Sequence, residues 1–426
     1  MSLVVQKFGG SSLATPEKIH RAARRAIRSK LEGRRVVLVV SAMGDSTDEL
    51  LKLASGVCSD PPKRELDMLL TTGEQVSIAL MAMAIESAGH EAISLTAGQL
   101  GLVTDSAHTR ARIQRISRER IDRELDQGRI VIVAGFQGTD AGGEITTMGR
   151  GASDTTAVAL AGALGADRCE VYKDVDGVYT ADPRLVPNAR RIPVLSYDAM
   201  LEMAGAGAGV LHPRAIDFAR KFNVALEVRS SLWEGKGTMI TPETAETAAL
   251  PVRGVVLRED LALAALAGVP NQPGVTARVF AQLADKQILV DDIVQGVEAD
   301  GRTVRISFSI SRTDAGATRE VCERLRQQCG WAGVEMDESV SKISAIGVGM
   351  RSHAGVAHVM FDALARAQID VLGISTSEIV ISCLVRRGDG PRALRGVHDA
   401  FGLGEPGPQA PMSGVTSLQG PAATKL

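Results

Sequence analysis

Near its N-terminus the chain reads Leu3-Val4-Val5-Gln6-Lys7-Phe8-Gly9-Gly10-Ser11-Ser12, a short apolar run that meets two glycines and two hydroxyl side chains. We expect a helix directly afterwards, because Thr15 can cap its first turn and Pro16 suits the first helical position. Glycines let backbone N–H groups approach a phosphate closely, and a helix N-terminus favours anions. The stretch therefore predicts a strand, a turn able to accept a phosphate and a helix, with an ordinary tight turn as the alternative. The spacing of a Walker loop is absent.

Similar short apolar runs recur through the first half of the chain, with helical stretches between them. Runs without polar alternation are typical of strands buried on both faces of a parallel sheet. The first part, roughly residues 1–245, is therefore expected to be α/β, with a mainly parallel sheet sandwiched by helices. The runs are Leu3–Val5, Val36–Val40, Ile93–Leu95, Ile130–Val133 and Val171–Tyr172.

The length and composition limit the classes of function. A chain of 426 residues is too long for one core and predicts about two to four domains. A net charge of −2 gives no reason to expect a polyanionic partner, and 3% aromatic residues leave little for base stacking. We therefore expect small-molecule substrates and no nucleic acid.

The sequence also predicts a cellular compartment. No apolar run is as long as a membrane span, and no basic segment precedes the first apolar residues as in a signal peptide. The cysteines are scattered and odd in number, which suits a reducing compartment and argues against a disulfide scaffold or a zinc site. A cytoplasmic protein without a membrane partner is expected. The cysteines are Cys58, Cys169, Cys322, Cys329 and Cys383.

The second half contains an internal repeat. It follows the segment Thr241–Pro251, which is interpreted as a linker or domain edge, and it appears when the chain is shifted by 81 residues. Each copy predicts a strand, a glycine turn, an amphipathic helix and further strands, the start of a βαββαβ pattern. The final stretch, Gly402–Leu426, is rich in Gly, Pro, Ala and Ser and is predicted to be disordered. Matching positions include Gly274 and Gly355, Phe280 and Phe361, and Ile288 and Ile369.

Several polar motifs lie at the expected strand ends. Gly149-Arg150-Gly151-Ala152-Ser153-Asp154-Thr155 places an arginine, a serine and an acid in a glycine-rich loop before an Ala-rich helix. Such a loop can clamp a carboxylate through the arginine and offer the acid to a metal or a lysine. A solvated loop is the alternative. Residues 173–184, KDVDGVYTADPR, combine charge, an aromatic ring and turn residues in a mixture that an edge turn would not need.

Together, KFGGSS, SAMGDSTDEL, TTGEQVS, GRGASDTTAVALA and KDVDGVYTADPR, in this order, resemble the aspartokinase family. The resemblance runs from about Leu3 to Gly402, and the repeated modules are similar to the tandem ACT domains of that family. It implies an amino-acid kinase catalytic domain at 1–245, ACT domains of the ferredoxin-like βαββαβ type at 256–337 and 338–404, and a tail at 405–426. It also implies a homo-oligomer, because ACT domains usually pair with those of another chain.

The activity implied by the resemblance is transfer of a phosphoryl group from ATP to the side chain of L-aspartate, giving 4-phospho-L-aspartate. This is the first step towards lysine, threonine and methionine. ATP and Mg²⁺ would be the cofactors, with Mg²⁺ bridging the ATP phosphates and no metal site in the protein itself. Two alternatives stay open: a kinase for another carboxylate amino acid, and a catalytically weak regulatory or binding paralogue.

The resemblance also assigns roles to individual residues. Lys7 would neutralise charge on the transferring group, Glu74 would hold the ammonium of the amino acid, and Arg150 a carboxylate. The catalytic set is Lys7, Asp154 and Asp174, and the substrate set is Thr47, Glu74, Arg150 and Ser153. The nucleotide set is Gly9, Gly10, Ser11, Ser41, Lys173, Asp174, Tyr179, Asp182 and Arg184.

Two positions of the catalytic part depart from the family pattern. Ala152 stands where a second glycine is usual, which would cost on the order of 1 kcal/mol if the position needs a positive φ, and nothing otherwise. Gly209 stands where the family has a lysine that reaches the nucleotide phosphates, so we expect weaker nucleotide binding or slower transfer.

The ACT region departs further. Ala354 replaces a usual proline, and four positions around the expected effector pocket are altered, so we expect weak or absent inhibition by threonine and lysine. Drift at exposed positions is the alternative. The expected effector-binding residues are Asp291, Gln295, Ser375 and Glu378, and the four altered positions are Leu289, Asp292, Gly296 and Arg305.

Overall fold

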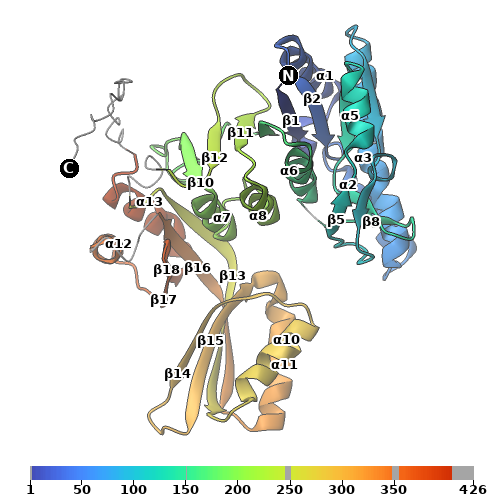
Figure 1. Ribbon diagram of the computed structural model, residues 1–426. Coiled ribbons are helices and arrows are strands. Elements are labelled where there is room, and N and C mark those ends of the chain that lie inside the picture. The colour runs from blue at the N-terminus through green and yellow to red at the C-terminus, as the bar shows by residue number, and fades with distance from the viewer. Residues whose placement is uncertain (1, 150, 245–250, 348–354, 405–426) are drawn as a thin grey trace, which may run out of the picture.

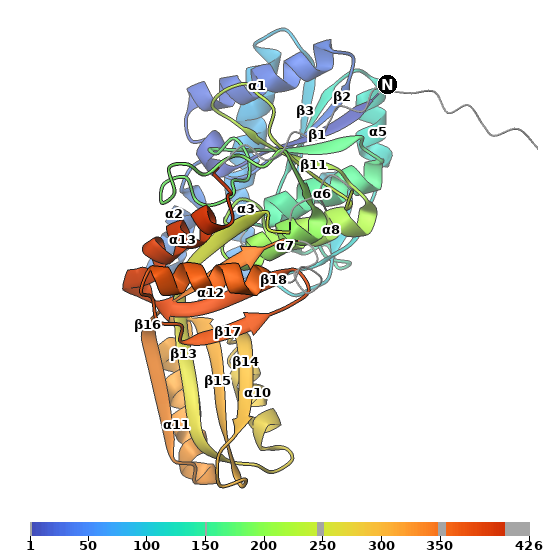
Figure 2. The same cartoon turned by 90° about the vertical axis from the view of Figure 1, so that its left-hand side faces the viewer.

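The computed structural model describes residues 2–149, 151–244, 251–347 and 355–404. An α/β lobe formed by the first half of the chain is followed by an elongated sheet with helices (Figures 1 and 2). The predicted tail, part of the predicted linker, and the segment with Ala354 that opens the second repeat lie outside the described residues.

The lobe is built on an eight-stranded sheet in the order β10-β12-β11-β9-β1-β2-β6-β3. Every pair of neighbouring strands is parallel except β11 and β12. All residues of β1 are buried, as expected for a strand covered on both faces. This confirms the prediction of a mainly parallel sheet. The strands are β1 (Leu3–Phe8), β2 (Arg35–Val40), β3 (Ala92–Leu95), β6 (Ile130–Ala134), β9 (Arg168–Lys173), β10 (Val194–Ser196), β11 (Leu226–Ser230) and β12 (Thr238–Thr241).

Helices cover both faces of this sheet. One core packs α1 and α3 against it, and a second core packs α5, α6, α7 and α8 against the other face. Helix α1 begins as predicted, with the Thr15 hydroxyl accepting from the backbone N–H of Lys18 at 3.4 Å and Pro16 as the first residue. The helices are α1 (Pro16–Leu31), α2 (Ser46–Val57), α3 (Lys63–Glu86), α5 (Glu119–Asp126), α6 (Ala152–Leu164), α7 (Tyr197–Gly205) and α8 (Pro213–Phe222).

Smaller elements complete the lobe. A four-stranded sheet in the order β5-β4-β7-β8 lies next to α3. Its strands are β4 (Leu102–Thr104), β5 (Ile113–Ile116), β7 (Gln137–Thr139) and β8 (Ile145–Thr147), and the short helices of the lobe are η1 (Gly10–Ser12) and α4 (Ala97–Leu100).

Helix α3 is the one described helix long and apolar enough to cross a membrane by length and composition. Half of the window that meets this test is buried inside the protein, as in a core helix of a soluble protein. The helix also carries the buried acids Asp67 and Glu74. The sequence-based statement that no stretch is as long as a membrane span therefore overlooked α3, although α3 serves here as a core helix.

The second half forms one six-stranded sheet in the order β14-β15-β13-β16-β18-β17. Two cores lie along it, one with α10 and α11 and one with α12 and α13. The strands are β13 (Gly254–Pro270), β14 (Val290–Val297), β15 (Thr303–Ser311), β16 (Gly333–Ile346), β17 (Gly373–Thr376) and β18 (Val380–Arg386). The helices are α10 (Val275–Asp285), η2 (Arg312–Asp314), α11 (Ala315–Cys329), α12 (Val356–Arg366), η3 (Arg387–Asp389) and α13 (Gly390–Ala400).

Strands β13 and β16 run through both modules. The first part of β13, Gly254 to Arg258, pairs with residues 342–346 of β16 beside the second module, and its later part pairs with β15 in the first module. The segment that leaves the α/β lobe therefore contributes a strand to the second module before the first module begins. The 81-residue repeat does not reveal this arrangement, because similarity between two copies does not show which strands pair.

Candidate active site

The candidate site lies at the carboxyl edge of the parallel strands β1, β2 and β9. Lys7 is next to the end of β1, Ser41 follows β2, and Lys173 ends β9. These strands are neighbours in the sheet, so their carboxyl ends meet at one edge, where ligands bind in open α/β sheets. The fold thus brings together residues that are far apart in the sequence.

Asp154 connects two of these strands. It lies in the first turn of α6, where its carboxylate contacts Lys7 Nζ at 2.6 Å and Lys173 Nζ at 3.1 Å. Lys7 and Asp154 are buried, and Lys173 is partly exposed. Two ammonium groups and one carboxylate leave one excess positive charge, which suits an anionic ligand such as a phosphate.

Opposing effects set the pKa values in this triad. Burial by itself would raise the pKa of Asp154, but the charges of Lys7 and Lys173 outweigh it and lower the pKa to about 2. Burial lowers the pKa of Lys7 from its ordinary value, although Asp154 opposes that shift. Asp154 is therefore ionised at neutral pH, and an arriving anion would favour the protonated form of Lys7.

The glycine turn after β1 allows two loops to touch. A Cβ atom on Gly10 would lie 2.8 Å from the Ala42 carbonyl oxygen and 2.9 Å from that of Gly44, so only glycine fits there. Gly9 is the N-cap residue of the short helix η1, and Ser11 is exposed. The hydroxyl of Ser12 is buried without a hydrogen-bond partner among the described residues. A buried hydroxyl without a partner at this turn makes Ser12 a candidate site residue that the sequence reasoning did not single out.

Glu74 is a buried acid with one unused oxygen. It lies on α3, and its Oε1 accepts from the Ala42 backbone N–H at 3.0 Å. Its Oε2 is buried and has no hydrogen-bond partner among the described residues. Burial raises the pKa of Glu74 to about 7. Such a carboxylate is suited to a cationic ligand, which would supply the missing donor and stabilise the ionised form. Thr47, half-buried in the first turn of α2, follows the loop that contains Ala42.

The backbone of the loop before α6 shows whether Ala152 is strained. The positions with positive φ are Gly149 at 84° and Gly151 at 74°, whereas Ala152 is the first residue of the helix. The alanine therefore causes no backbone strain. Ser153 is buried at the start of the helix. Arg150, expected to hold a carboxylate, lies outside the described residues.

The remaining predicted nucleotide residues lie in the loop after β9. Tyr179 donates its hydroxyl to Asp176 at 2.8 Å, and Asp182 binds the Arg184 guanidinium at 2.6 Å. Asp174 is exposed. These contacts stay within the loop, so Lys173, at its start, is the member of this group that the structure places in the Asp154 triad.

Gly209 lies in an exposed loop before α8. A Cβ atom there would meet no atom within 4 Å, so a longer side chain fits. Three residues later, His212 caps α8 and packs against Gly151, where a Cβ would lie 2.4 Å from its ring. The Gly209 loop is thus close in sequence to a residue that contacts the loop before α6.

Asp67 is a buried acid near the candidate site that the sequence reasoning did not single out. It is fully buried on α3 and accepts from the Thr147 hydroxyl at 2.6 Å, the Thr109 N–H at 3.0 Å and His108 Nδ1 at 2.8 Å. Thr109 has a positive φ of 69°, and its carbonyl lies against Gly149. Asp67 thus fixes the surroundings of the loop before α6. The sequence signal that could have indicated Asp67 was an acidic residue within an otherwise apolar helix.

The predicted effector residues divide into two groups. Asp291 and Ser375 line a polar cavity of about 320 Å³ between α7 and the second sheet, whereas Gln295 and Glu378 are exposed and are not among its lining residues. Lys342 is buried in this cavity and binds Asp291 at 2.6 Å.

Of the altered regulatory positions, Asp292 alone lines this cavity. Its carboxylate binds Lys342 at 2.7 Å and accepts from the Ser375 hydroxyl at 2.8 Å, which links β14 to β16 and β17. Leu289 is 84% exposed, and Arg305 binds Glu335 at 2.9 Å on the surface. The sequence reasoning therefore grouped positions that lie in different surroundings; the fourth, Gly296, is also exposed.

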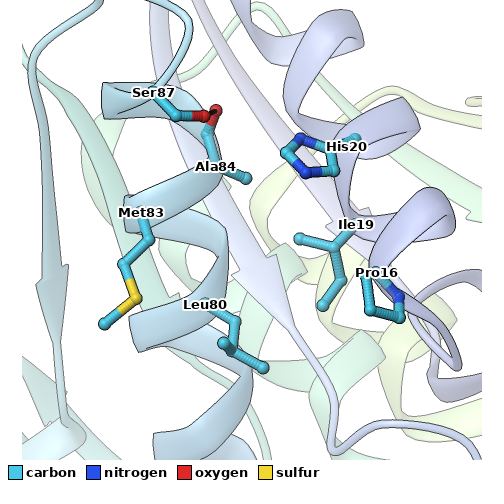
Figure 3. A pocket seen from close by; sticks show the side chains of 7 residues that line it. All are labelled: Pro16, Ile19, His20, Leu80, Met83, Ala84 and Ser87. Atoms are coloured by element: carbon cyan, nitrogen blue, oxygen red, sulfur yellow. Dashed lines mark hydrogen bonds between the residues drawn. The ribbon is translucent and has the colours of Figure 1, made fainter.

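An apolar groove of about 290 Å³ lies between α1 and α3, away from these polar residues (Figure 3). Its lining includes Ile19 of α1 and Leu80 of α3, whose side chains point toward the space between the two helices. Its lining contains no Lys, Arg, Asp or Glu side chain. Among the residues that the structure describes, no group of three or more His, Cys, Asp or Glu side chains is arranged to hold a metal ion.

Comparisons with known proteins identify the family of the chain. The family model described as the amino acid kinase family matches residues 2–230, and a model of the ACT domain matches residues 343–401. The chain is 48% identical to the aspartokinase of Bacillus sp. (strain MGA3), over 95% of this chain and 98% of that protein. It is 47% identical to aspartokinase 2 of Bacillus subtilis, with the same coverage.

Solved structures show the same similarity. Escherichia coli aspartokinase III in complex with aspartate and ADP (R-state) superposes with a TM-score of 0.80 at 25% identity, covering 94% of this chain and 99% of that one. The same enzyme in complex with lysine and aspartate (T-state) gives a TM-score of 0.76 at 25% identity and the same coverage.

Proposed function

Because this chain belongs to the amino acid kinase family and, within it, to the aspartokinases, we propose that the Lys7–Asp154–Lys173 triad and Glu74 form its catalytic centre. The chain is an aspartate kinase, which uses ATP to phosphorylate the side-chain carboxylate of L-aspartate. The observation that carries the assignment of the amino-acid site is Glu74, a buried carboxylate with one oxygen unused.

The triad acts on the transferring phosphoryl group. Lys7 and Lys173 bring positive charge to the edge of the sheet, and Asp154 holds both ammonium groups in place. Charge on the phosphoryl oxygens is thereby stabilised by groups that need no rearrangement during the reaction. Asp174, exposed at the start of the loop after β9, would organise the phosphate end of the site.

The amino acid binds between α3 and the loop before α6. Its ammonium group donates to Glu74 Oε2, and this contact offsets the free energy that burying the carboxylate requires. Arg150 binds a carboxylate of the substrate, and Thr47 and Ser153 add hydroxyl contacts. Asp67 positions this region through Thr109.

The nucleotide lies along the glycine turn and the loop after β9. The backbone N–H groups of Gly9, Gly10 and Ser11 face its phosphates together with Ser41, and the unpaired Ser12 hydroxyl gives a further contact. Tyr179, Asp182 and Arg184 line the rest of the nucleotide. Mg²⁺ would enter with ATP and would supply positive charge next to the phosphates.

The reaction requires no general base. An oxygen of the aspartate side-chain carboxylate forms a bond to the γ-phosphorus, and the bond from that phosphorus to the β–γ bridging oxygen breaks. The electron pair leaves with ADP, and the product is the mixed anhydride 4-phospho-L-aspartate. Catalysis therefore consists of positioning and electrostatic stabilisation.

We further propose the setting of this activity. The product would enter the route to lysine, threonine and methionine in the cytoplasm, and lysine and threonine would be weak effectors at most. A homo-oligomer is supported by β14, an outermost strand of the second sheet, whose apolar side chains Ile293, Val294 and Val297 are more than half exposed.

The proposal is tested by a coupled assay of ADP release with aspartate, glutamate and related acids. Release that depends on aspartate, with the other acids at least tenfold poorer in kcat/KM, is the expected result. Release with another acid at higher kcat/KM would replace aspartate as the substrate. The Lys7→Ala protein serves as the control for contaminating ATPase activity.

A further inference from the structure

Helix α13 of the second module packs against the loop after β9, which carries the proposed nucleotide residues. Ala181 and Val186 of this loop belong to the same apolar core as Leu394 and Val397 of α13. Part of the loop is thus folded into the regulatory core.

One polar contact in this interface is buried. His398 of α13 is fully buried, and its Nε2 lies 3.0 Å from the hydroxyl oxygen of Thr180, which is 6% exposed. The other contacts lie nearer the surface, for example the one from Asn188 to Asp399 at 3.1 Å. The buried pair joins residues 218 positions apart.

The hydrogen bonds around Thr180 define the role of each atom. Its hydroxyl oxygen accepts from the Arg190 backbone N–H at 3.0 Å, so its single hydrogen is free to be donated to His398 Nε2. That donation requires the neutral tautomer with the proton on Nδ1, which lies 3.5 Å from Asp399 Oδ1. Burial lowers the pKa of His398, Asp399 opposes this shift and Arg190 adds to it, in agreement with a neutral ring.

The backbone at Thr180 is also held on both sides. Its N–H donates to the Arg190 carbonyl at 2.8 Å, and its own carbonyl accepts from the Val255 N–H on β13 at 2.8 Å. The side chain adds a third attachment, to α13. Thr180 is therefore a buried point of attachment between the loop after β9 and the second module.

We propose that His398 is a positioning residue for the nucleotide and that it acts through the Thr180 hydroxyl. The inference rests on the proposed nucleotide role of Tyr179 and Asp182, which lie on either side of Thr180. When His398 accepts the Thr180 hydrogen bond, the backbone that carries these two residues is fixed. The second module thus supports ATP binding indirectly, through the loop after β9, in the absence of any effector.

Nucleotide binding by variants of this pair tests the inference. His398→Leu and Thr180→Val each remove one partner and should weaken ADP binding, measured by calorimetry, by about fivefold to twentyfold. The KM for ATP should rise by the same factor and the KM for aspartate by less than about twofold. The double variant should bind ADP no more weakly than the weaker single variant, because both changes remove the same contact. His398→Gln, whose Oε1 can accept from Thr180, should recover most of the affinity.

The matched control is Val385→Ala. Val385 is fully buried on β18 in the same core, and its side chain cannot form a hydrogen bond. If this variant weakens ADP binding as much as His398→Leu, or if the two single effects add, the hydrogen bond has no positioning role. Failure of His398→Gln to recover affinity would also overturn the inference. Wild-type protein without aspartate-dependent ADP release would refute the proposed function itself, whatever these variants do.

Discussion

Replacing Glu74 by glutamine should make the protein more stable at alkaline pH while damaging its use of aspartate. Burial raises the pKa of Glu74 from 4.5 to about 7. Ionising this side chain therefore costs more free energy in the folded state than in the unfolded state. The folded state binds the proton more tightly, so the native protein loses stability as pH rises from about 4.5 to 7. Above pH 7 the loss is complete, at about 3 kcal/mol.

Glutamine cannot ionise and is nearly the same size. It keeps an oxygen for the Ala42 N–H, which Glu74 Oε1 now accepts at 3.0 Å. The melting temperature of the variant minus that of the wild type should therefore be about 4–10 °C larger at pH 8 than at pH 5. Comparing the two proteins at each pH cancels the titration of all other groups. The assay is calorimetry at both pH values.

Kinetics and a control complete the test. The KM for aspartate should rise at least tenfold in Glu74→Gln and the KM for ATP by less than about twofold, because a charge-assisted contact to the ammonium is lost. The control is Glu124→Gln, since Glu124 is also buried but binds Arg120 at 2.9 Å and Arg129 at 2.6 Å. It should be destabilised at pH 8. A melting difference for Glu74→Gln that is the same at pH 5 and pH 8 would refute the argument from burial.

Other predictions address the triad, the missing lysine and regulation. Lys7→Ala should lower kcat by at least a hundredfold with an unchanged circular dichroism spectrum, because Lys7 acts mainly in the transition state; turnover within a few-fold of wild type would exclude it from the mechanism. Gly209→Lys should tighten ATP binding by about fivefold or more, since the site is open and the new charge lies on the loop before His212; an unchanged Kd would mean that Lys173 already fills the role. Inhibition by threonine and lysine, titrated singly and together, should stay weak, because Lys342 already forms an ion pair with Asp292. Half-inhibition below 1 mM would contradict this.

Much of the fold was predictable from local pattern. The unbroken apolar runs indicated a parallel sheet because such strands must be covered on both faces, and Thr15 with Pro16 marked the start of α1. The family resemblance assigned Lys7 and Asp154 to one site, and the structure places their side chains 2.6 Å apart. The roles assigned to these residues stay predictions until the kinetics are measured.

Other features depended on the three-dimensional arrangement. The resemblance named Glu74 but could not indicate that burial would leave one carboxylate oxygen unpaired. Asp67 lies in a helix whose pattern indicated only a core element, because its partners come from a distant loop and from β8. Among the altered regulatory positions, only the folded chain distinguishes Asp292, which binds Lys342, from the exposed Leu289.

By itself, the sequence determined which elements form and which family of chemistry they serve, because hydrophobic period, caps and motifs are properties of neighbouring residues. Only the tertiary structure decided that β13 serves both modules and that His398 meets Thr180. Contacts of this kind join distant parts of the chain, and their strength depends on burial and on the hydrogen-bond partners that remain. Neither quantity exists until the chain has folded.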